Sequence, residues 1–297
     1  MPPNSRVLGV GIATLDIINT VATHTSEDDE VRALTQRKTR GGNATNTLVV
    51  LSALGHRCDW AGVLAEESDT LFIKQDLDHH QVSYKHCKSL LGGKMPTSYV
   101  RLAQDTGSRS IVHYRDLPEY DFASYKMLTL ENYDWIHFEG RNIDDTLLMM
   151  QYTKNTHPSL PLSLEIEKPR DNIESLFPYA TVLLFSKPYA LAQGFKHARP
   201  FLEQLATTHS NATLICAWGE QGAYAINNKE EFFYSPSYPP PQVLDTLGAG
   251  DTFNAGIIDS LLKARPIDAA LSAACRLAGE KCGHTGLIRE NHHDHNI

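Results

Sequence analysis

The most informative segment is Asp245-Thr246-Leu247-Gly248-Ala249-Gly250-Asp251-Thr252-Phe253. Gly248 and Gly250 let the backbone approach a ligand without a Cβ clash, and Ala249 adds little bulk. The apolar residues that follow recur at roughly helical spacing, so the turn is expected to begin an amphipathic helix. The free N–H groups and the positive end of the dipole at a helix N-terminus suit phosphate oxygens. We therefore expect an anion-binding turn here.

Asp251 places a carboxylate directly after this turn. We expect the positive potential of the helix terminus to keep Asp251 ionised and able to accept a proton. An anion site beside a base is the arrangement that phosphoryl transfer requires. The alternative is purely structural, because glycine-rich turns capped by aspartate are common in proteins.

A second segment, Arg40-Gly41-Gly42-Asn43-Ala44-Thr45-Asn46, leads into a helix expected over residues 44–54. Asn43 and Asn46 are three residues apart, so their amides share one helix face. Each amide offers both donors and an acceptor, which suits the hydroxyl groups of a sugar. Asn43 alone is equally well explained as a helix N-cap, but capping does not explain Asn46.

Short apolar runs alternate with helix-like segments along most of the chain. We expect buried strands at 7–11, 135–138, 160–166, 181–185 and 213–217, and late helices at 251–262 and 267–282. This alternation predicts an α/β fold with a central, mostly parallel sheet sandwiched by helices. Asp16 follows the first strand, near the carboxyl edge where such sheets bind ligands.

Two segments, about 14–38 and 95–116, break this alternation. The second contains two expected strands, 97–102 and 110–114, joined by the turn residues Asp105-Thr106-Gly107-Ser108. We expect both segments to form a small antiparallel β lid, discontinuous in sequence, on a single domain that spans residues 1–297.

Composition narrows the classes of partner. The 297 residues include 35 acidic and 27 basic side chains, a formal charge of −8 that disfavours nucleic acid or an anionic membrane surface. No apolar run approaches the length of a membrane span, and the five dispersed cysteines fit a reducing cytoplasm. The C-terminal His292-His293-Asp294-His295 could bind metal, although chain termini are more often poorly ordered.

Other nucleotide and hydrolase motifs are absent. Gly9-Val10-Gly11-Ile12-Ala13-Thr14 begins like a dinucleotide fingerprint, but Thr14 stands where the third glycine belongs. The sequence has no P-loop motif and no Gly-x-Ser-x-Gly nucleophile motif.

With its Gly-Gly-Asn and Gly-Ala-Gly-Asp turns in this order, the chain resembles the ribokinase-like carbohydrate kinases, and within them the ketohexokinase subgroup. Further blocks that resemble this subgroup lie at residues 137–142, 165–170, 216–218 and 239–248. The resemblance covers the chain up to about Gly286. It implies ATP and Mg²⁺ as cofactors and leaves open a monovalent cation such as K⁺.

The resemblance also implies a role for each matching residue. Asp251 would be the base, with Gly248, Ala249 and Gly250 forming the anion hole. The sugar would be held by Asp16, Gly42, Asn43 and Asn46, with Asp28 reaching the partner's sugar site in a homodimer clasped through the lids. The nucleotide would be bound by Arg109, Lys187, Gly219, Glu220, Gln221 and Gly222.

One departure concerns the metal. Many members of the family carry Asn-x-x-Glu after a middle strand, where this chain has Ser186-Lys187-Pro188-Tyr189. The Ser-Lys pair favours the ketohexokinase subgroup and leaves the metal-positioning residues open. The expected activity is transfer of phosphate from ATP to the 1-hydroxyl of a ketohexose such as fructose. Another sugar or a nucleoside as acceptor, and a non-catalytic sugar or nucleotide sensor, remain as alternatives.

Overall fold

A nine-stranded sheet forms the centre of the computed structural model, which describes residues 4–24, 26–106 and 108–289. Its strand order is β15-β14-β13-β12-β11-β10-β1-β4-β6, parallel from β13 to β6 and antiparallel at β14 and β15. Its strands are β1 Arg6–Val10, β4 Arg57–Ala61, β6 Val82–Ser83, β10 Trp135–Glu139, β11 Leu162–Ile166, β12 Val182–Ser186, β13 Thr213–Ala217, β14 Ala223–Ile226 and β15 Phe232–Ser235.

All five predicted buried strands are present, as β1, β10, β11, β12 and β13. Every residue of β10 and of β11 is buried, as expected for parallel strands covered on both faces. The predicted α/β class is therefore confirmed. The short strands β4, β6, β14 and β15 were not predicted, because runs of two to five residues carry little periodicity.

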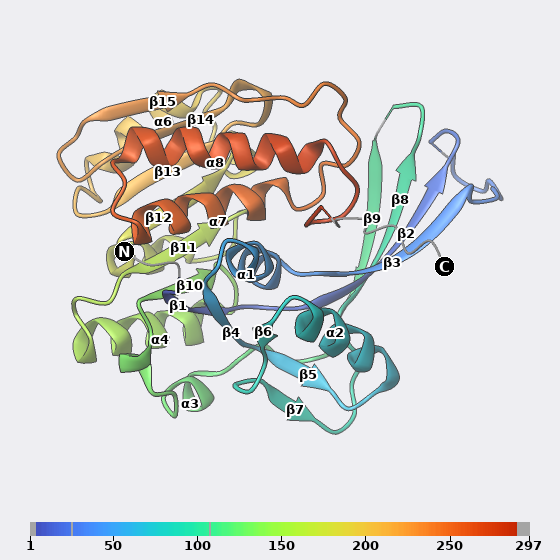
Figure 1. The fold of residues 1–297 in the computed structure, drawn as a ribbon, viewed down its shortest axis with the longest axis horizontal. Coiled ribbons are helices and arrows are strands. Elements are labelled where there is room, and N and C mark those ends of the chain that lie inside the picture. Colours follow the sequence, from blue (N-terminus) through green and yellow to red (C-terminus); the bar gives the residue numbers. More distant parts are fainter. Residues whose placement is uncertain (1–3, 25, 107, 290–297) are drawn as a thin grey trace, which may run out of the picture.

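Helices cover both faces of this sheet, and α1, α7 and α8 pack against one another on one of them (Figure 1). The helices are α1 Asn43–Ala53, α2 Ser68–His79, α3 Phe122–Tyr125, α4 Ile143–Thr156, α5 Lys187–Ala192, α6 Ala198–Ala206, α7 Ala249–Leu262 and α8 Ile267–Cys282, with 3₁₀ turns η1 Leu130–Asn132, η2 Ile173–Tyr179 and η3 Gly219–Gln221. The predicted helices over 44–54, 251–262 and 267–282 are thus confirmed to within two residues.

A four-stranded sheet stands away from the body (Figure 1), in the order β3-β2-β8-β9. Its strands are β2 Thr14–Val21, β3 Thr35–Gly41, β8 Thr97–Ala103 and β9 Arg109–Tyr114. The prediction that this sheet is antiparallel was wrong at its centre, where β2 and β8 are parallel. Both strands leave the body in the same direction and each turns back through its own antiparallel hairpin, so the two outgoing strands meet side by side.

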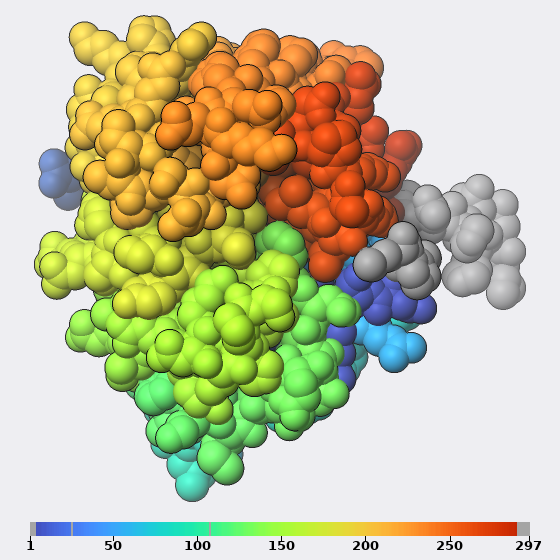
Figure 2. All heavy atoms as spheres, turned by 90° about the vertical axis from the view of Figure 1, so that its left-hand side faces the viewer, coloured from blue at the N-terminus to red at the C-terminus, as the bar shows by residue number. Residues whose placement is uncertain are grey.

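The remaining strands, β5 Val63–Ala65 and β7 Lys88–Leu90, form a small separate pair. The side opposite the four-stranded sheet is formed mainly by segments from the middle and the C-terminal part of the chain (Figure 2). In the part of the chain that the structure describes, no helix is long and apolar enough to cross a membrane. The histidine-rich stretch 292–295 lies outside the described residues.

Candidate active site

A cavity of about 630 Å³ lies between the four-stranded sheet and the body. It opens where β10, β11, β12 and β13 end, beside the first turns of α1 and α7. This is the carboxyl edge of the parallel strands, the usual ligand site of open α/β sheets. The cavity therefore brings together segments that lie far apart in the sequence.

Asp251 lies in the wall of this cavity, in the first turn of α7. It is 7% exposed, and its Oδ2 accepts a hydrogen bond of 2.7 Å from Asn46 Nδ2. Burial raises the pKa of Asp251 to about 7; the Asn46 bond opposes this rise, whereas the charges of Glu167 and Glu139 add to it. The expectation that the helix terminus keeps Asp251 fully ionised was therefore wrong, because loss of solvent outweighs the dipole. A carboxyl that titrates near neutral pH is well suited to act as a general base.

The turn before Asp251 has the geometry of an anion site. Gly248 is the N-cap of α7 with φ of +77°, and among the described residues no side chain caps this helix. Gly248 and Gly250 line the cavity, and a Cβ at Gly250 would meet no other atom within 4 Å. Ala249 begins the helix but is not part of the cavity lining. The free N–H groups of the first turn are thus available to an anionic ligand.

The two asparagines of α1 each hold a carboxyl group. Asn43 Nδ2 donates to Glu165 Oε1 at 3.0 Å, one helical turn before the bond from Asn46 to Asp251. Arg40 Nη1 donates to Asn46 Oδ1 at 2.8 Å, which fixes the orientation of this amide. Both asparagines line the cavity, but the N-cap of α1 is Gly42, so the capping explanation of Asn43 was wrong.

The bond from Asn46 makes a pH-dependent prediction. Because the bond stabilises the ionised form of Asp251, Asn46→Ala should raise the pKa of this carboxyl by about one unit. The acidic limb of the kcat/KM profile, expected near pH 7, should move to higher pH by that amount. Asn43→Ala is the matched control: its amide bonds Glu165, so the limb should stay in place. An unmoved limb in Asn46→Ala would contradict the role assigned to this bond.

Gly42 and Asp16 come from the two strands that join the lid to the body. Gly42 has φ of +105°, and a Cβ there would lie 2.2 Å from the carbonyl oxygen of Ile12. A side chain is therefore excluded where the backbone reaches the cavity. Asp16 Oδ1 accepts a bond of 2.8 Å from Thr14, and burial raises the pKa of Asp16 despite the bonds from Thr14 and Ser98. Gly42 and Asp16 both line the cavity.

The residues predicted to bind nucleotide or a partner's sugar are placed less centrally. Arg109, at the start of β9, lines the cavity. Lys187 does not; its ammonium lies 5.8 Å from the centre of the Trp218 ring. The turn 219–222 follows Ala217, which lines the cavity, but is not itself part of the lining. Asp28 is exposed in the loop between β2 and β3, away from the cavity of its own chain.

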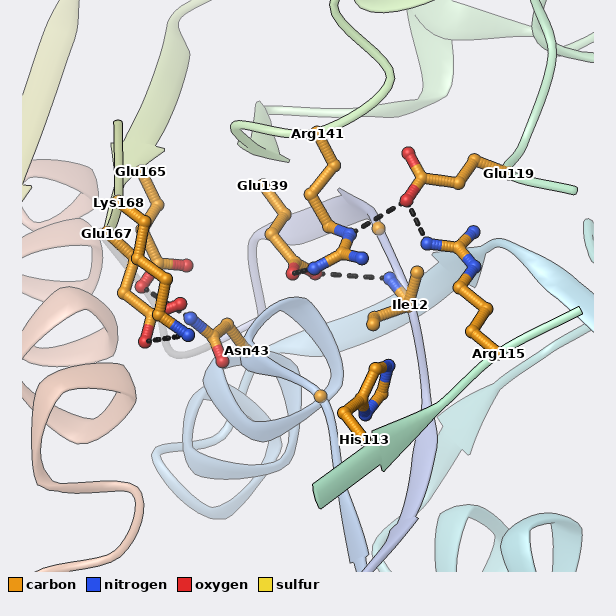
Figure 3. A network of polar contacts seen from close by, with 12 residues as sticks. Ile12, Asn43, His113, Arg115, Glu119, Glu139, Arg141, Glu165, Glu167 and Lys168 are labelled. Atoms are coloured by element: carbon orange, nitrogen blue, oxygen red, sulfur yellow. Dashed lines mark hydrogen bonds and ion pairs between the residues drawn. The ribbon is translucent and has the colours of Figure 1, made fainter. Parts of the chain in front are cut away.

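Sequence reasoning missed a polar network at the ends of β10 and β11 (Figure 3). Glu139 Oε2 accepts from the Ile12 N–H at 3.1 Å, and its Oε1 lies 3.5 Å from Arg141 Nη1. Arg141 Nε donates to Glu119 at 2.9 Å, and Glu119 also pairs with Arg115 just beyond β9. The signal was present, because polar residues that directly follow predicted buried strands are expected at the carboxyl edge.

Beneath the anion-binding turn lies a buried ionic cluster around Asp245. Lys281 Nζ, on a side chain only 1% exposed, donates to the Asp245 carbonyl oxygen at 2.7 Å and lies 3.7 Å from its carboxylate. Arg37, on the lid strand β3, binds the same carboxylate at 2.9 Å. The N–H groups of Leu247 and Gly286 complete the set. This cluster ties the turn, the lid and the end of α8 together.

The sequence matches the pfkB family carbohydrate kinases over residues 4–294. The chain belongs to this family. It is 39% identical to the ketohexokinase of Mus musculus over 290 residues, which cover 95% of this chain and 97% of that protein. It is thus an ATP-dependent sugar kinase of the pfkB family.

Two solved ribokinases share the fold of this pfkB kinase. The ribokinase of Cryptococcus neoformans var. grubii serotype A, in complex with ADP, superposes with a TM-score of 0.77 at 19% identity, covering 95% of each chain. The ribokinase of Arabidopsis thaliana, complexed with ribose and ATP, gives a TM-score of 0.77 at 18% identity over 95% of this chain and 93% of that chain. The ribokinase-like fold is therefore confirmed.

A magnesium ion is implied by the use of ATP. Among the described residues, no group of three or more His, Cys, Asp or Glu side chains is placed to hold a metal ion. Magnesium in kinases commonly keeps several waters and binds through the substrate phosphates and few protein groups. The site therefore fits an ion that arrives with ATP and whose charge neutralises the phosphates, and not one held in a protein cage.

Proposed function

We propose that this pfkB kinase transfers the γ-phosphoryl group of ATP to the 1-hydroxyl of a ketohexose, with fructose giving fructose 1-phosphate. The observation that carries the proposal is the hydrogen-bonded pair of Asp251 and Asn46 at the uncapped N-terminus of α7, facing the cavity. The 39% identity to the ketohexokinase of Mus musculus, over nearly the whole chain, supports the choice of acceptor.

In this mechanism Asp251 takes the proton of the attacking hydroxyl. The sugar oxygen forms a bond to the γ-phosphorus while the bond to the β–γ bridging oxygen breaks, and ADP leaves with that oxygen. The N–H groups of Gly248, Ala249 and Gly250 stabilise the charge on the transferred group. Asp16, Gly42, Asn43 and Asn46 position the sugar. Asn46 does so while it also holds Asp251, which places the base beside the acceptor.

Arg109 is assigned to the phosphates, because it lines the cavity from the lid and forms no salt bridge among the described residues. Lys187 and residues 219–222 are assigned to the nucleotide, at the edge of the cavity next to Ser186 and Ala217. A lid that closes over these groups keeps out water, which would otherwise accept the phosphoryl group.

A homodimer clasped through the lids is part of the proposal. Four large apolar or aromatic side chains are exposed on the lid of the single chain: Tyr99, Ile111, Val112 and Tyr114. Asp28, in the exposed loop between β2 and β3, would then reach the sugar site of the partner. This explains why a residue matching the subgroup lies away from the cavity of its own chain.

An acceptor panel tests the proposed reaction. With ATP and Mg²⁺, ADP release should depend on added fructose, and NMR of the product should locate the phosphate on the 1-oxygen. Turnover with ribose or a nucleoside, and none with fructose, would overturn the assignment in favour of another acceptor. Thermal stabilisation by sugar with no turnover at all would support a sensor, although such a protein has no need of a base like Asp251.

A further inference from the structure

Glu165 is a buried carboxyl that the proposed reaction does not use. It lies on β11 in the cavity wall and is only 6% exposed. Its Oε1 accepts the bond from Asn43, whereas its Oε2 is buried with no hydrogen-bond partner among the described residues. A buried carboxylate without a partner is costly, so this oxygen requires an explanation.

The groups that face Glu165 are mainly acidic. Glu139 is its register partner on β10, Asp251 approaches from α7, and Glu167 follows on its own segment. The nearby cations serve other carboxylates: Arg141 contacts Glu139 and Glu119, and Lys168 lies 3.5 Å from Glu167. Arg170 lines the cavity but forms no ion pair within 4.0 Å among the described residues. An ionised Glu165 would therefore lack a compensating charge.

The three buried carboxyls differ in how well their charged form is supported. Asp251 receives the short bond from Asn46, and Glu139 receives a backbone N–H and the Arg141 guanidinium. Glu165 receives only one neutral amide. Burial, followed by the charges of Asp251, Glu139 and Glu167, raises the pKa of Glu165 well above its ordinary value. When neighbouring carboxyls compete for a proton, the least supported one keeps it.

We propose that Glu165 stays protonated at neutral pH as a positioning residue, holding Asn43 through Oε1 and leaving Asp251 free to ionise as the base. A second negative charge at this position would make Asp251 harder to deprotonate. Storing the proton on Glu165 prevents this. The inference rests on the proposed role of Asp251 as the base, but the protonation of Glu165 can be observed independently of that role.

Glu165→Gln is the deciding variant, because glutamine is a neutral mimic of the protonated acid and keeps an oxygen for Asn43. We expect kcat to stay within about threefold of the wild type. The acidic limb of the kcat/KM profile should move by no more than about 0.3 pH unit, since no charge is removed. If Glu165 were ionised, the same change would remove repulsion and shift this limb to clearly lower pH. Such a shift, or a loss of about 100-fold in kcat, would overturn the proposal.

Glu167→Gln is the matched control, two residues away on an exposed side chain that also lines the cavity. It removes a carboxylate whose charge raises the pKa of Asp251, so the limb should move down by about half a pH unit. Glu165→Ala distinguishes the neutral acid from a mere space filler. Losing the acceptor for Asn43 should raise the KM for the sugar, and Glu165→Gln should not.

A direct measurement does not depend on activity. The infrared difference spectrum between wild type and Glu165→Gln at pH 8 should contain the C=O band of one protonated carboxyl, lost in the variant. A band of an ionised carboxylate at this pH would contradict the proposal, even if both proteins were active. If Asp251→Asn turned out fully active, the proposed base would be wrong, while this spectrum would still report on Glu165.

Discussion

Replacing Asp251 with asparagine is expected to lower kcat by about 10²–10⁴-fold, the usual contribution of a positioned base. The amide cannot take the proton of the attacking hydroxyl, but its oxygen can still accept the bond from Asn46. The fold and the sugar KM should therefore change little. Steady-state kinetics with fructose and ATP, beside circular dichroism of the variant, measure both quantities.

Asp259→Asn is the control for this prediction. Asp259 is another buried carboxylate of α7, paired with His56 at 2.9 Å and with Lys263, two turns further along the helix. Its loss should lower the free energy of unfolding and leave kcat of the folded enzyme nearly unchanged. Near-normal turnover in folded Asp251→Asn would remove Asp251 from the mechanism.

Asp245→Ala is expected to cause the largest loss of stability, about 3–5 kcal/mol in the free energy of unfolding. The Lys281 ammonium, on a side chain 1% exposed, would be left buried without its carboxylate partner. Arg37 and the N–H groups of Leu247 and Gly286 would also lose their acceptor. Because these contacts fix the turn before Gly248, the KM for ATP should rise as well. Denaturant unfolding and ATP titration measure the two effects.

A second substitution separates the buried charge from the rest. Lys281→Met, added to Asp245→Ala, removes the unpaired ammonium and should recover part of the lost stability. Asp268→Asn, at an exposed site in the first turn of α8, should change the free energy of unfolding by less than about 1 kcal/mol. A loss in Asp245→Ala no larger than in this control would show that the cluster is not stabilising.

Much of the fold could be read from local patterns. The apolar runs of β1, β10, β11, β12 and β13 are buried on both faces, so continuous hydrophobicity identified them. The parallel pairing of β2 and β8 could not be predicted, because it depends on the direction in which two distant segments leave the body. Periodicity within each segment carries no information about such pairing.

The candidate site divides in the same way. The two glycine-containing turns were located in the sequence because Gly and Asn have strong local preferences. That Asn43 binds Glu165 and Asn46 binds Asp251 was not foreseeable, since the partners lie 122 and 205 residues away. The pKa of Asp251 was misjudged for a related reason: helix position is local, whereas burial depends on every segment packed around it.

The sequence alone determined which turns bind anions, which strands are buried and which kinase family the chain resembles, because each is encoded by neighbouring residues. Only the tertiary structure decided how the carboxyls Glu139, Glu165 and Asp251 divide their hydrogen bonds and protons. It also decided that Lys281 is buried beside Asp245. Electrostatic energy depends on distance and on exclusion of water, and both exist only after distant segments have packed together.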